Sequence, residues 1–393
     1  MCWMKKIDTL LIGGIVVAVL FGVVGVLPSF GASEVPSRKI VVFRDGAVNE
    51  SAREALVKKF GGVKIKNLNS INGKVVLLAP RAEAALKADP RVLRVDDDVI
   101  VEALGKTVQV AAGQTLPWGI DRVDADLVWG TTVGDAVKVG VIDTGIELSH
   151  PDLAANIKGG YNAINSTRSA NDDNGHGTHV AGIIAAANNS IGVVGVGPAI
   201  DLYAIKVLSR TGSGYLSDVI EGLNWAVVNG LQIVNMSLGS SSNVQSFADA
   251  VVAAKAAGLV MVAAAGNSGA AVSYPAAYPE VIAVSATDSN NMIASFSSRG
   301  PEVDIAAPGV SIYSTYKGKI YKTLSGTSMA SPHVAGAAAL LMSVPAKCDA
   351  DLSGACSPDE VQSRLENTAT DFGALGKDFL YGAGLLNVWA SLQ

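Results

Sequence analysis

Cysteine, histidine and charge are all scarce in this chain of 393 residues. It contains 3 cysteines and 4 histidines, and only 17% of its residues are Asp, Glu, Lys or Arg. A formal net charge of −5 gives no basic surface for nucleic acid, so we expect no nucleic-acid partner. The low charge also argues against a coiled coil or a disordered chain. With 49% hydrophobic residues and 42 glycines, the composition favours a tightly turned α/β protein of two or three domains.

The first 32 residues differ from the rest of the chain. Lys5 and Lys6 precede an apolar run from residue 10 to residue 27, and a stretch of small residues follows it. This order predicts an export signal over residues 1–32 and hence a secreted protein. The run is also long enough to cross a bilayer, so a protein anchored to the membrane by an uncleaved signal is the alternative.

Residues 33–104 have the pattern of a small α+β domain, in which apolar strands alternate with helices. The expected elements are strands at 39–43, 74–79 and 91–103 and helices at 51–61 and 81–90. The segment 105–115 has little periodicity, and we expect it to be a linker at the start of a larger domain, 105–393.

From Pro117 onward, short apolar runs alternate with helical stretches. The runs are nearly continuous, which is typical of parallel strands buried on both faces. We expect strands at 136–143, 202–208, 233–238 and 259–267, and helices at 178–187, 217–230 and 246–258. This alternation predicts a three-layer α/β domain with functional residues at the carboxyl ends of its strands.

Three polar residues lie where such a domain places its functional groups. Asp143 directly follows a buried strand, His176 begins a helix, and Ser328 lies between a glycine turn and another helix. A hydroxyl, an imidazole that takes its proton and a carboxylate that orients the imidazole are the requirements of nucleophilic acyl transfer. Each position is weak evidence by itself, because an isolated Asp or Ser there is more often a helix cap or a turn residue.

His176 and His179 also raise the possibility of a metal pair. A zinc hydrolase of the common type has Glu after its first histidine, whereas Gly177 follows His176, and His333 is the remaining plausible ligand. We therefore expect His176, at the mouth of the helix, to be a base, and His179, inside the first turn, to pack in the core.

Four longer motifs occur together and in order: VIDTGIELSHPDL, NGHGTHVAG, AAAGN and GTSMASPHVAG. Over about residues 114–393 the chain resembles the subtilisin family of serine proteases, whose chain order of acid, base and nucleophile is the one seen here. The resemblance implies that Asp143 orients the base, His176 is the general base and Ser328 is the nucleophile. It also implies that the Asn267 amide binds the oxyanion, although Gly-Asn alone also favours a turn.

The resemblance further implies a cleft in which two extended segments hold a peptide substrate by backbone hydrogen bonds. The segments would contribute Gly212, Gly214 and Leu216 on one side and Ser237, Leu238 and Gly239 on the other. The pocket for the residue before the scissile bond would contain Ser237, Ala264, Gly266 and Ser273. A second apolar pocket would contain Leu216, Val219 and Leu238. These small, uncharged linings predict broad specificity with a preference for large apolar residues.

Calcium is the cofactor that the resemblance implies. The ligands would be the side chains of Gln114, Asp152 and Asn189 and the carbonyl groups of Ala187, Ile191 and Val193, which form an all-oxygen set. The alternative for this loop is a plain Asn-Asn-Ser turn.

A second calcium loop is a weaker expectation. Residues 349–360 have the spacing D-x-D-x-S-G-x₅-E, but Ser357, Pro358 and Glu360 equally predict a helix N-terminal capping box. Cys348 and Cys356 could close the same loop as a disulfide, because export implies an oxidising environment.

Residues 33–104 resemble the pro-segment of the family, which assists folding and then inhibits. We expect self-cleavage between Leu104 and Gly105. The sequence thus predicts a secreted, monomeric, calcium-stabilised serine endopeptidase that acts on proteins and peptides, with its own pro-segment as a partner. The alternative is a catalytically silent relative that acts as a binding module.

Overall fold

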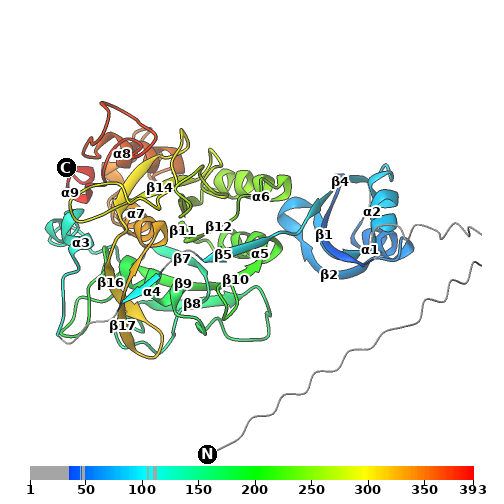
Figure 1. Cartoon of the computed structure of the whole chain (residues 1–393), viewed down its shortest axis with the longest axis horizontal. Helices are drawn as coiled ribbons and strands as arrows, with labels where there is room; N and C mark the ends of the chain where they lie inside the picture. The colour runs from blue at the N-terminus through cyan, green and yellow to red at the C-terminus, as the bar shows by residue number, and fades with distance from the viewer. Residues whose placement is uncertain (1–34, 45, 47–48, 104–105, 109–112) are drawn as a thin grey trace, which may run out of the picture. The chain divides into compact units, whose positions relative to one another are not determined.

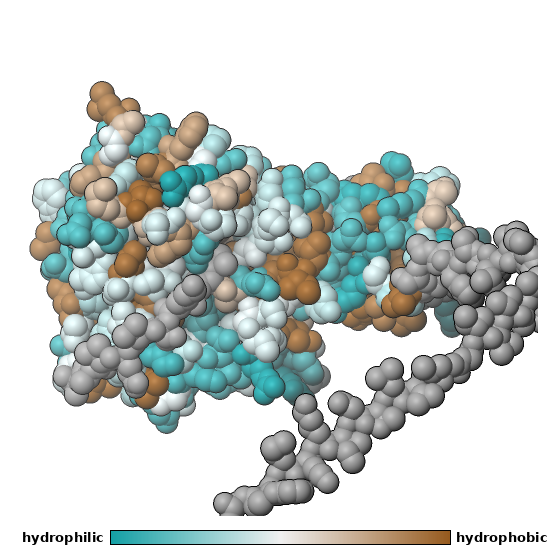
Figure 2. All heavy atoms as spheres, viewed as in Figure 1, coloured by the Kyte–Doolittle hydropathy of each residue, from teal (hydrophilic) through white to brown (hydrophobic). Residues whose placement is uncertain are grey.

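The computed structural model describes residues 35–44, 46, 49–103, 106–108 and 113–393. The predicted signal at 1–32 and both residues of the predicted cleavage site, Leu104 and Gly105, lie outside this part of the chain. Among the described residues, no helix is long and apolar enough to span a bilayer. Hydrophilic and hydrophobic residues are interspersed over the face of the molecule shown in Figure 2.

A parallel sheet is the centre of the larger domain (Figure 1). In the described part of the chain its strands lie in the order β15-β14-β13-β11-β7-β9-β8, and all neighbouring pairs are parallel. The strands are β7 (Lys138–Asp143), β8 (Ile157–Asn162), β9 (Asp201–Lys206), β11 (Ile233–Met236), β13 (Val260–Ala264), β14 (Ile282–Thr287) and β15 (Ile305–Pro308). This confirms the predicted three-layer α/β fold.

Helices cover both faces of the sheet because its side chains alternate between two apolar cores. Val139 and Val141 of β7 belong to the core that includes α4 (His176–Ala185) and α7 (Thr327–Met342). Ile142 belongs to the opposite core, with α5 (Leu216–Val228) and α6 (Gln245–Ala256). The other helices of this domain are α3 (Trp118–Arg122), α8 (Pro358–Asn367) and α9 (Val388–Ser391).

Strand β7 lies at the point where the strand order reverses. Its neighbours are β9 on one side and β11 on the other, so the chain leaves β7 toward one half of the sheet and returns to the other half. The carboxyl ends of strands at such a switch point are where open α/β sheets bind ligands. Asp143 is the last residue of β7.

The predicted small domain has a four-stranded antiparallel sheet of order β2-β3-β1-β4. Its elements are β1 (Ser37–Phe43), α1 (Glu50–Lys59), β2 (Val63–Leu68), β3 (Gly73–Leu78), α2 (Pro80–Lys87) and β4 (Val92–Asp97). Val41 and Phe43 pack against α1 and α2, while Ile40 and Val42 belong to the core that contains α5 and α6. The sheet is therefore covered on both faces, by its own helices and by those of the larger domain.

Two further sheets differ from the sequence-based expectation. The predicted strand 91–103 is two strands, because β5 (Ile100–Ala103) leaves the small sheet and joins β10 (Ser213–Tyr215) and β12 (Leu238–Gly239). The predicted linker contains β6 (Lys106–Val108), which pairs with β17 (Ile320–Ser325) beside β16 (Ile312–Tyr316). In both cases strands distant in sequence supply the partners, so local periodicity does not reveal the pairing.

Candidate active site

Asp143 and His176 are in direct contact at the carboxyl end of the central sheet. His176 Nδ1 lies 2.8 Å from Asp143 Oδ1 and 2.9 Å from Oδ2. Asp143 is fully buried and His176 is 6% exposed. A proton on Nδ1 is donated to the carboxylate, so Nε2 is the basic nitrogen of the neutral ring.

Ser328 is the second residue of α7 and is hydrogen-bonded to Ser237, which follows β11. Its Oγ donates a hydrogen bond to the Ser237 carbonyl group at 3.0 Å, and Ser237 Oγ donates to the Ser328 carbonyl group at 2.9 Å. Both serines are fully buried. The predicted nucleophile therefore has a fixed position at a helix N-terminus, where backbone N–H groups lack helical partners.

The amide of Asn267 is oriented by the first residue of the same helix. Asn267 Oδ1 accepts hydrogen bonds from the N–H and from the hydroxyl of Thr327, each at 2.9 Å. The Thr327 hydroxyl accepts in turn from the N–H of Gly266 at 3.1 Å. Because the amide oxygen is engaged by α7, the NH₂ group is the end that Asn267 can offer to a ligand.

The two segments predicted to hold a substrate lie on either side of β5. Val101 and Glu102 pair with Gly214 and Ser213, and the Ala103 N–H donates to the Gly212 carbonyl group at 2.8 Å. On the other side, Ala103 and Glu102 pair with Leu238 and Gly239. The end of the small domain is thus an extended strand between β10 and β12 (Figure 1), the two segments predicted to hold a substrate.

The side chain of Val101 lies in the apolar core that also contains the residues of the predicted second pocket. It is fully buried and belongs to the same apolar cluster as Leu216, Val219 and Leu238. Ile100 on the alternate face of the strand is 58% exposed. Strand β5 therefore directs alternate side chains into the core and toward the surface, as a strand added to a sheet edge does.

The residues predicted for the first pocket are small and closely packed around Gly266. Ala264 ends β13, and Gly266 has a φ of 116°. A Cβ at this position would lie 2.6 Å from Ser273 Oγ, so a residue larger than glycine would fill the space between Gly266 and Ser273. Ser273 donates its N–H to the Ala265 carbonyl group at 2.8 Å, whereas Ser237 contacts Ser328 of α7.

The residues predicted to bind calcium also lie together. The carboxylate of Asp152 accepts from Asn189 Nδ2 at 2.7 Å and from the N–H of Val193 at 2.9 Å. Gln114 Nε2 donates to the Ala187 carbonyl group at 3.0 Å. Burial raises the pKa of Asp152, because the apolar surroundings disfavour its charge. The sixth predicted ligand, Ile191, donates its N–H to Asn189 Oδ1 in the same loop.

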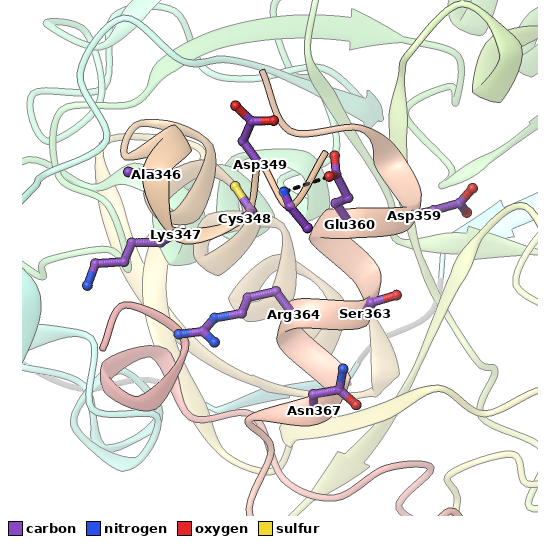
Figure 3. Close-up of a pocket in the computed structure, with 10 residues that line it drawn as sticks. Ala346, Lys347, Cys348, Asp349, Asp359, Glu360, Ser363, Arg364 and Asn367 are labelled. Atoms are coloured by element: carbon purple, nitrogen blue, oxygen red, sulfur yellow. Dashed lines mark hydrogen bonds between the residues drawn. The ribbon is translucent and has the colours of Figure 1, made fainter. Parts of the chain in front are cut away.

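The predicted second calcium loop, 349–360, contains both predicted local features. Ser357 and Glu360 form a capping box at the start of α8, and Cys348 and Cys356 form a disulfide with Cα atoms 5.4 Å apart. Figure 3 shows Cys348, Asp349 and Glu360 of this region. Ligand atoms of Asp349, Asp351 and Glu360 lie within 4.8 Å of one another. Glu360 is engaged by the cap and by the N–H groups of residues 350 and 351, so calcium binding there stays a prediction.

Three residues that contact the predicted triad, Asn267 or the backbone beside His176 are not among those predicted from the sequence. Thr327 orients Asn267, Thr144 donates its N–H to Asp143 Oδ1 at 2.7 Å, and Asp172 accepts hydrogen bonds around His176. Thr144 and Thr327 lie inside the quoted motifs and Asp172 lies two residues before one, yet a motif does not record which backbone groups a side chain binds.

Comparisons with known proteins agree with this geometry. Residues 134–384 match the subtilase family. The chain is 43% identical to subtilisin E of Bacillus subtilis (strain 168) over 373 residues, covering 92% of each chain. It is 47% identical to an alkaline protease of Shouchella clausii over 320 residues, covering 81% of this chain and 78% of the relative. Against subtilisin DY of Bacillus licheniformis the identity is 50% over 286 residues, covering 71% of this chain and all of the relative. The chain therefore belongs to the subtilase family and is a subtilisin-like serine endopeptidase.

Proposed function

We propose that this endopeptidase hydrolyses peptide bonds with a triad of Ser328, His176 and Asp143 through an acyl-enzyme. The observation that carries the proposal is the contact of 2.8 Å between His176 Nδ1 and Asp143, on buried groups at the switch point of the sheet. In this mechanism Nε2 of His176 takes the Ser328 proton as the hydroxyl attacks the peptide carbonyl group, and later donates it to the leaving amine. Asp143 keeps the ring in the required tautomer and stabilises its cation.

The oxyanion of the tetrahedral intermediate would be bound by the Asn267 NH₂ group and the Ser328 N–H. Thr327 holds the amide oxygen of Asn267 through two hydrogen bonds, which supports a fixed direction for the NH₂ group. Donors fixed before the reaction stabilise the developing charge without reorganisation.

The same proposal includes specificity for large apolar residues before the scissile bond. Support comes from the small residues beside Gly266, and the burial of Val101 in the apolar cluster of Leu216, Val219 and Leu238 supports an apolar preference at the second pocket. Cleavage of a peptide library dominated by Lys or Arg before the scissile bond would contradict it.

We propose further that the protein is a secreted zymogen, with a signal at 1–32, a pro-segment at 33–104 and a protease domain at 105–393. The placement of β5 between β10 and β12 supports cleavage after Leu104, one residue beyond the end of that strand. N-terminal sequencing of the mature protein tests this, and a start beyond Gly113 would refute it.

Calcium is the proposed cofactor at Gln114, Asp152, Ala187, Asn189, Ile191 and Val193. The donor set fits, because the buried Asp152 carboxylate, the carbonyl groups and the amide oxygens are hard ligands. The NH₂ groups of Gln114 and Asn189 now donate to two of those oxygens, so both amides lie beside the site and would turn their oxygens toward the ion. When bound, the ion would neutralise Asp152 and connect the segment at Gln114 to the loop after α4.

Labelling with a serine-directed phosphonate tests the central proposal. We expect stoichiometric labelling of the mature wild-type protein and none of the Ser328→Ala variant. Labelling that persists in Ser328→Ala would refute the assignment of the nucleophile. No labelling of the mature wild-type protein would instead favour a binding module.

A further inference from the structure

The carboxylate of Asp172 receives hydrogen bonds from both sides of His176. Asp172 Oδ1 accepts from the N–H groups of Asn174 and Gly175, each at 2.9 Å. Asp172 Oδ2 accepts from the N–H and the hydroxyl of Thr178, at 3.0 and 2.6 Å. Asp172 is only 4% exposed. One carboxylate thus fixes the backbone immediately before and shortly after the imidazole.

Thr144 connects the same carboxylate to Asp143. The Thr144 hydroxyl donates to Asp172 Oδ1 at 2.9 Å and accepts from the N–H of Gly177 at 2.9 Å. The Thr144 N–H donates to Asp143 Oδ1 at 2.7 Å. The end of β7 and the start of α4 are therefore joined through one threonine whose hydroxyl is oriented by Asp172.

The local sequence explains why an ionised side chain outside the helix is needed. Residue 175, the N-cap of α4, is a glycine with a φ of 117° and has no side chain with which to cap the helix. A Cβ there would lie 2.3 Å from the Tyr316 ring, so a capping residue cannot replace it. The carboxylate of Asp172 supplies the missing acceptor, and its charge is favoured at a helix N-terminus. Hydrogen bonds to an ionised acceptor are also the stronger kind.

We propose that Asp172 is a positioning residue, which holds α4 and the end of β7 in the register that the His176–Asp143 hydrogen bond requires. It acts through the backbone at Gly175, Gly177 and Thr178 and through the Thr144 hydroxyl. This inference rests on the proposed triad.

The Asp172→Asn variant tests the proposal because it keeps the shape of the side chain but replaces one accepting oxygen with a donor. We expect kcat to fall about 10- to 100-fold, since small displacements of a catalytic group are costly, while KM changes less than about twofold. The substrate-holding edges, β10 and β12, lie on other parts of the chain.

Asp173→Asn is the matched control. It removes the same charge one residue away, from a carboxylate that is 54% exposed and pairs with Lys206 Nζ at 2.7 Å. We expect its kcat to stay within about twofold of wild type. An equal loss in both variants would mean that charge, and not the hydrogen bonds of Asp172, matters, and would overturn the proposal.

Each kcat is expressed per active site titrated with the phosphonate, on protein produced as the full chain. If Asp172→Asn only unfolds some molecules, the number of titrated sites falls and kcat per site is unchanged, which also overturns the proposal. Should Asp172→Asn fail to fold, Thr144→Val removes the hydroxyl that Asp172 orients, and the same loss in kcat per site is expected. The wild-type and Ser328→Ala labelling is measured separately, so failure of the triad assignment is distinguished from failure of this inference.

Discussion

His176 and His179 lie three residues apart on α4 in very different surroundings. His176 contacts Asp143, whereas His179 is fully buried and its Nε2 lies 3.1 and 3.0 Å from the carbonyl oxygens of Ile312 and Lys322. Two carbonyl acceptors at one nitrogen fix the proton on Nε2. The two rings therefore suit a base and a structural donor, respectively.

We expect His176→Ala to lower kcat by about 10⁶-fold, a loss known from subtilisin itself and carried over from there. His179→Ala should keep kcat per titrated site within about tenfold and lower the free energy of unfolding by about 1–3 kcal/mol, because it removes a buried donor from two carbonyl groups. Active-site titration and thermal unfolding measure the two effects. The reverse pattern would contradict the assignment of the base.

Two buried histidines predict a loss of stability in acid. Burial lowers the pKa of His179 to about 3 and that of His333 to about 4, against an ordinary value of 6.5. At a pH between the lowered pKa of each ring and 6.5, the unfolded state binds more protons than the folded state. Their stabilisation is therefore complete above pH 6.5 and declines as the pH falls, by about 1.4 kcal/mol per pH unit for each ring.

The Tm of the inactive Ser328→Ala chain, measured from pH 7.5 to pH 5, checks this prediction. We expect a His333→Gln variant of that chain to lose stability with a shallower slope, because glutamine does not titrate. Parallel slopes in the two proteins would contradict it.

At the scale of elements, the loop after α4 is expected to determine the response to chelation. Removal of an ion that is present at about 100 times its Kd costs about 2.7 kcal/mol, which corresponds to a fall in Tm of roughly 5–10 °C. EDTA should have this effect on wild type and no effect on Asp152→Asn, which removes the buried carboxylate. Thermal unfolding with and without EDTA measures it.

Asp349→Asn is the control, because it alters the other candidate loop, at the start of α8. We expect its response to EDTA to equal that of wild type. If Asp349→Asn lost the response to EDTA and Asp152→Asn kept it, the calcium site would be assigned to the loop before α8 instead.

The sequence predicts a strand or a helix well where the pattern of apolar residues within that element alone is sufficient to identify it. The buried runs that become β7, β9, β11 and β13 are of this kind. The edge strand β2 is not among the predicted strands, although its apolar residues alternate with lysines. Strand β5 is predicted only as part of the strand 91–103, and β6 is not predicted, because the partners of both are distant in the chain. For the same reason the long motifs locate Asp143, His176 and Ser328, whereas the role of Asp172 depends on backbone N–H groups that no side-chain pattern records.

At the scale of the whole molecule, ionic contacts join the proposed pro-segment to α5. Lys66 Nζ lies 2.5 Å from Asp218, 2.6 Å from Glu221 and 2.8 Å from the Ala163 carbonyl oxygen. The Asp218 side chain is 6% exposed, and burial raises its pKa. Removal of Lys66 alone would leave two partly buried carboxylates without this cation, which is costly.

We therefore expect Lys66→Met to release the pro-segment about tenfold faster, the effect of ~1.4 kcal/mol. The measurement is the delay between the appearance of the cut chain on a gel and the onset of peptidase activity. Lys64→Met is the control, because Lys64 pairs with Glu54 within the pro-segment. Equal delays in the two variants would contradict a role for the Lys66 contacts.

The pairing of β5 bears on product release from the proposed mature enzyme. Strand β5 is bound at both edges through backbone groups, which every peptide possesses. The part of a cleaved substrate that ends at the new carboxyl terminus retains those same groups. We therefore expect product inhibition whose strength depends on the length of the released peptide more than on its sequence, and which slows digestion of a protein before its substrate is exhausted.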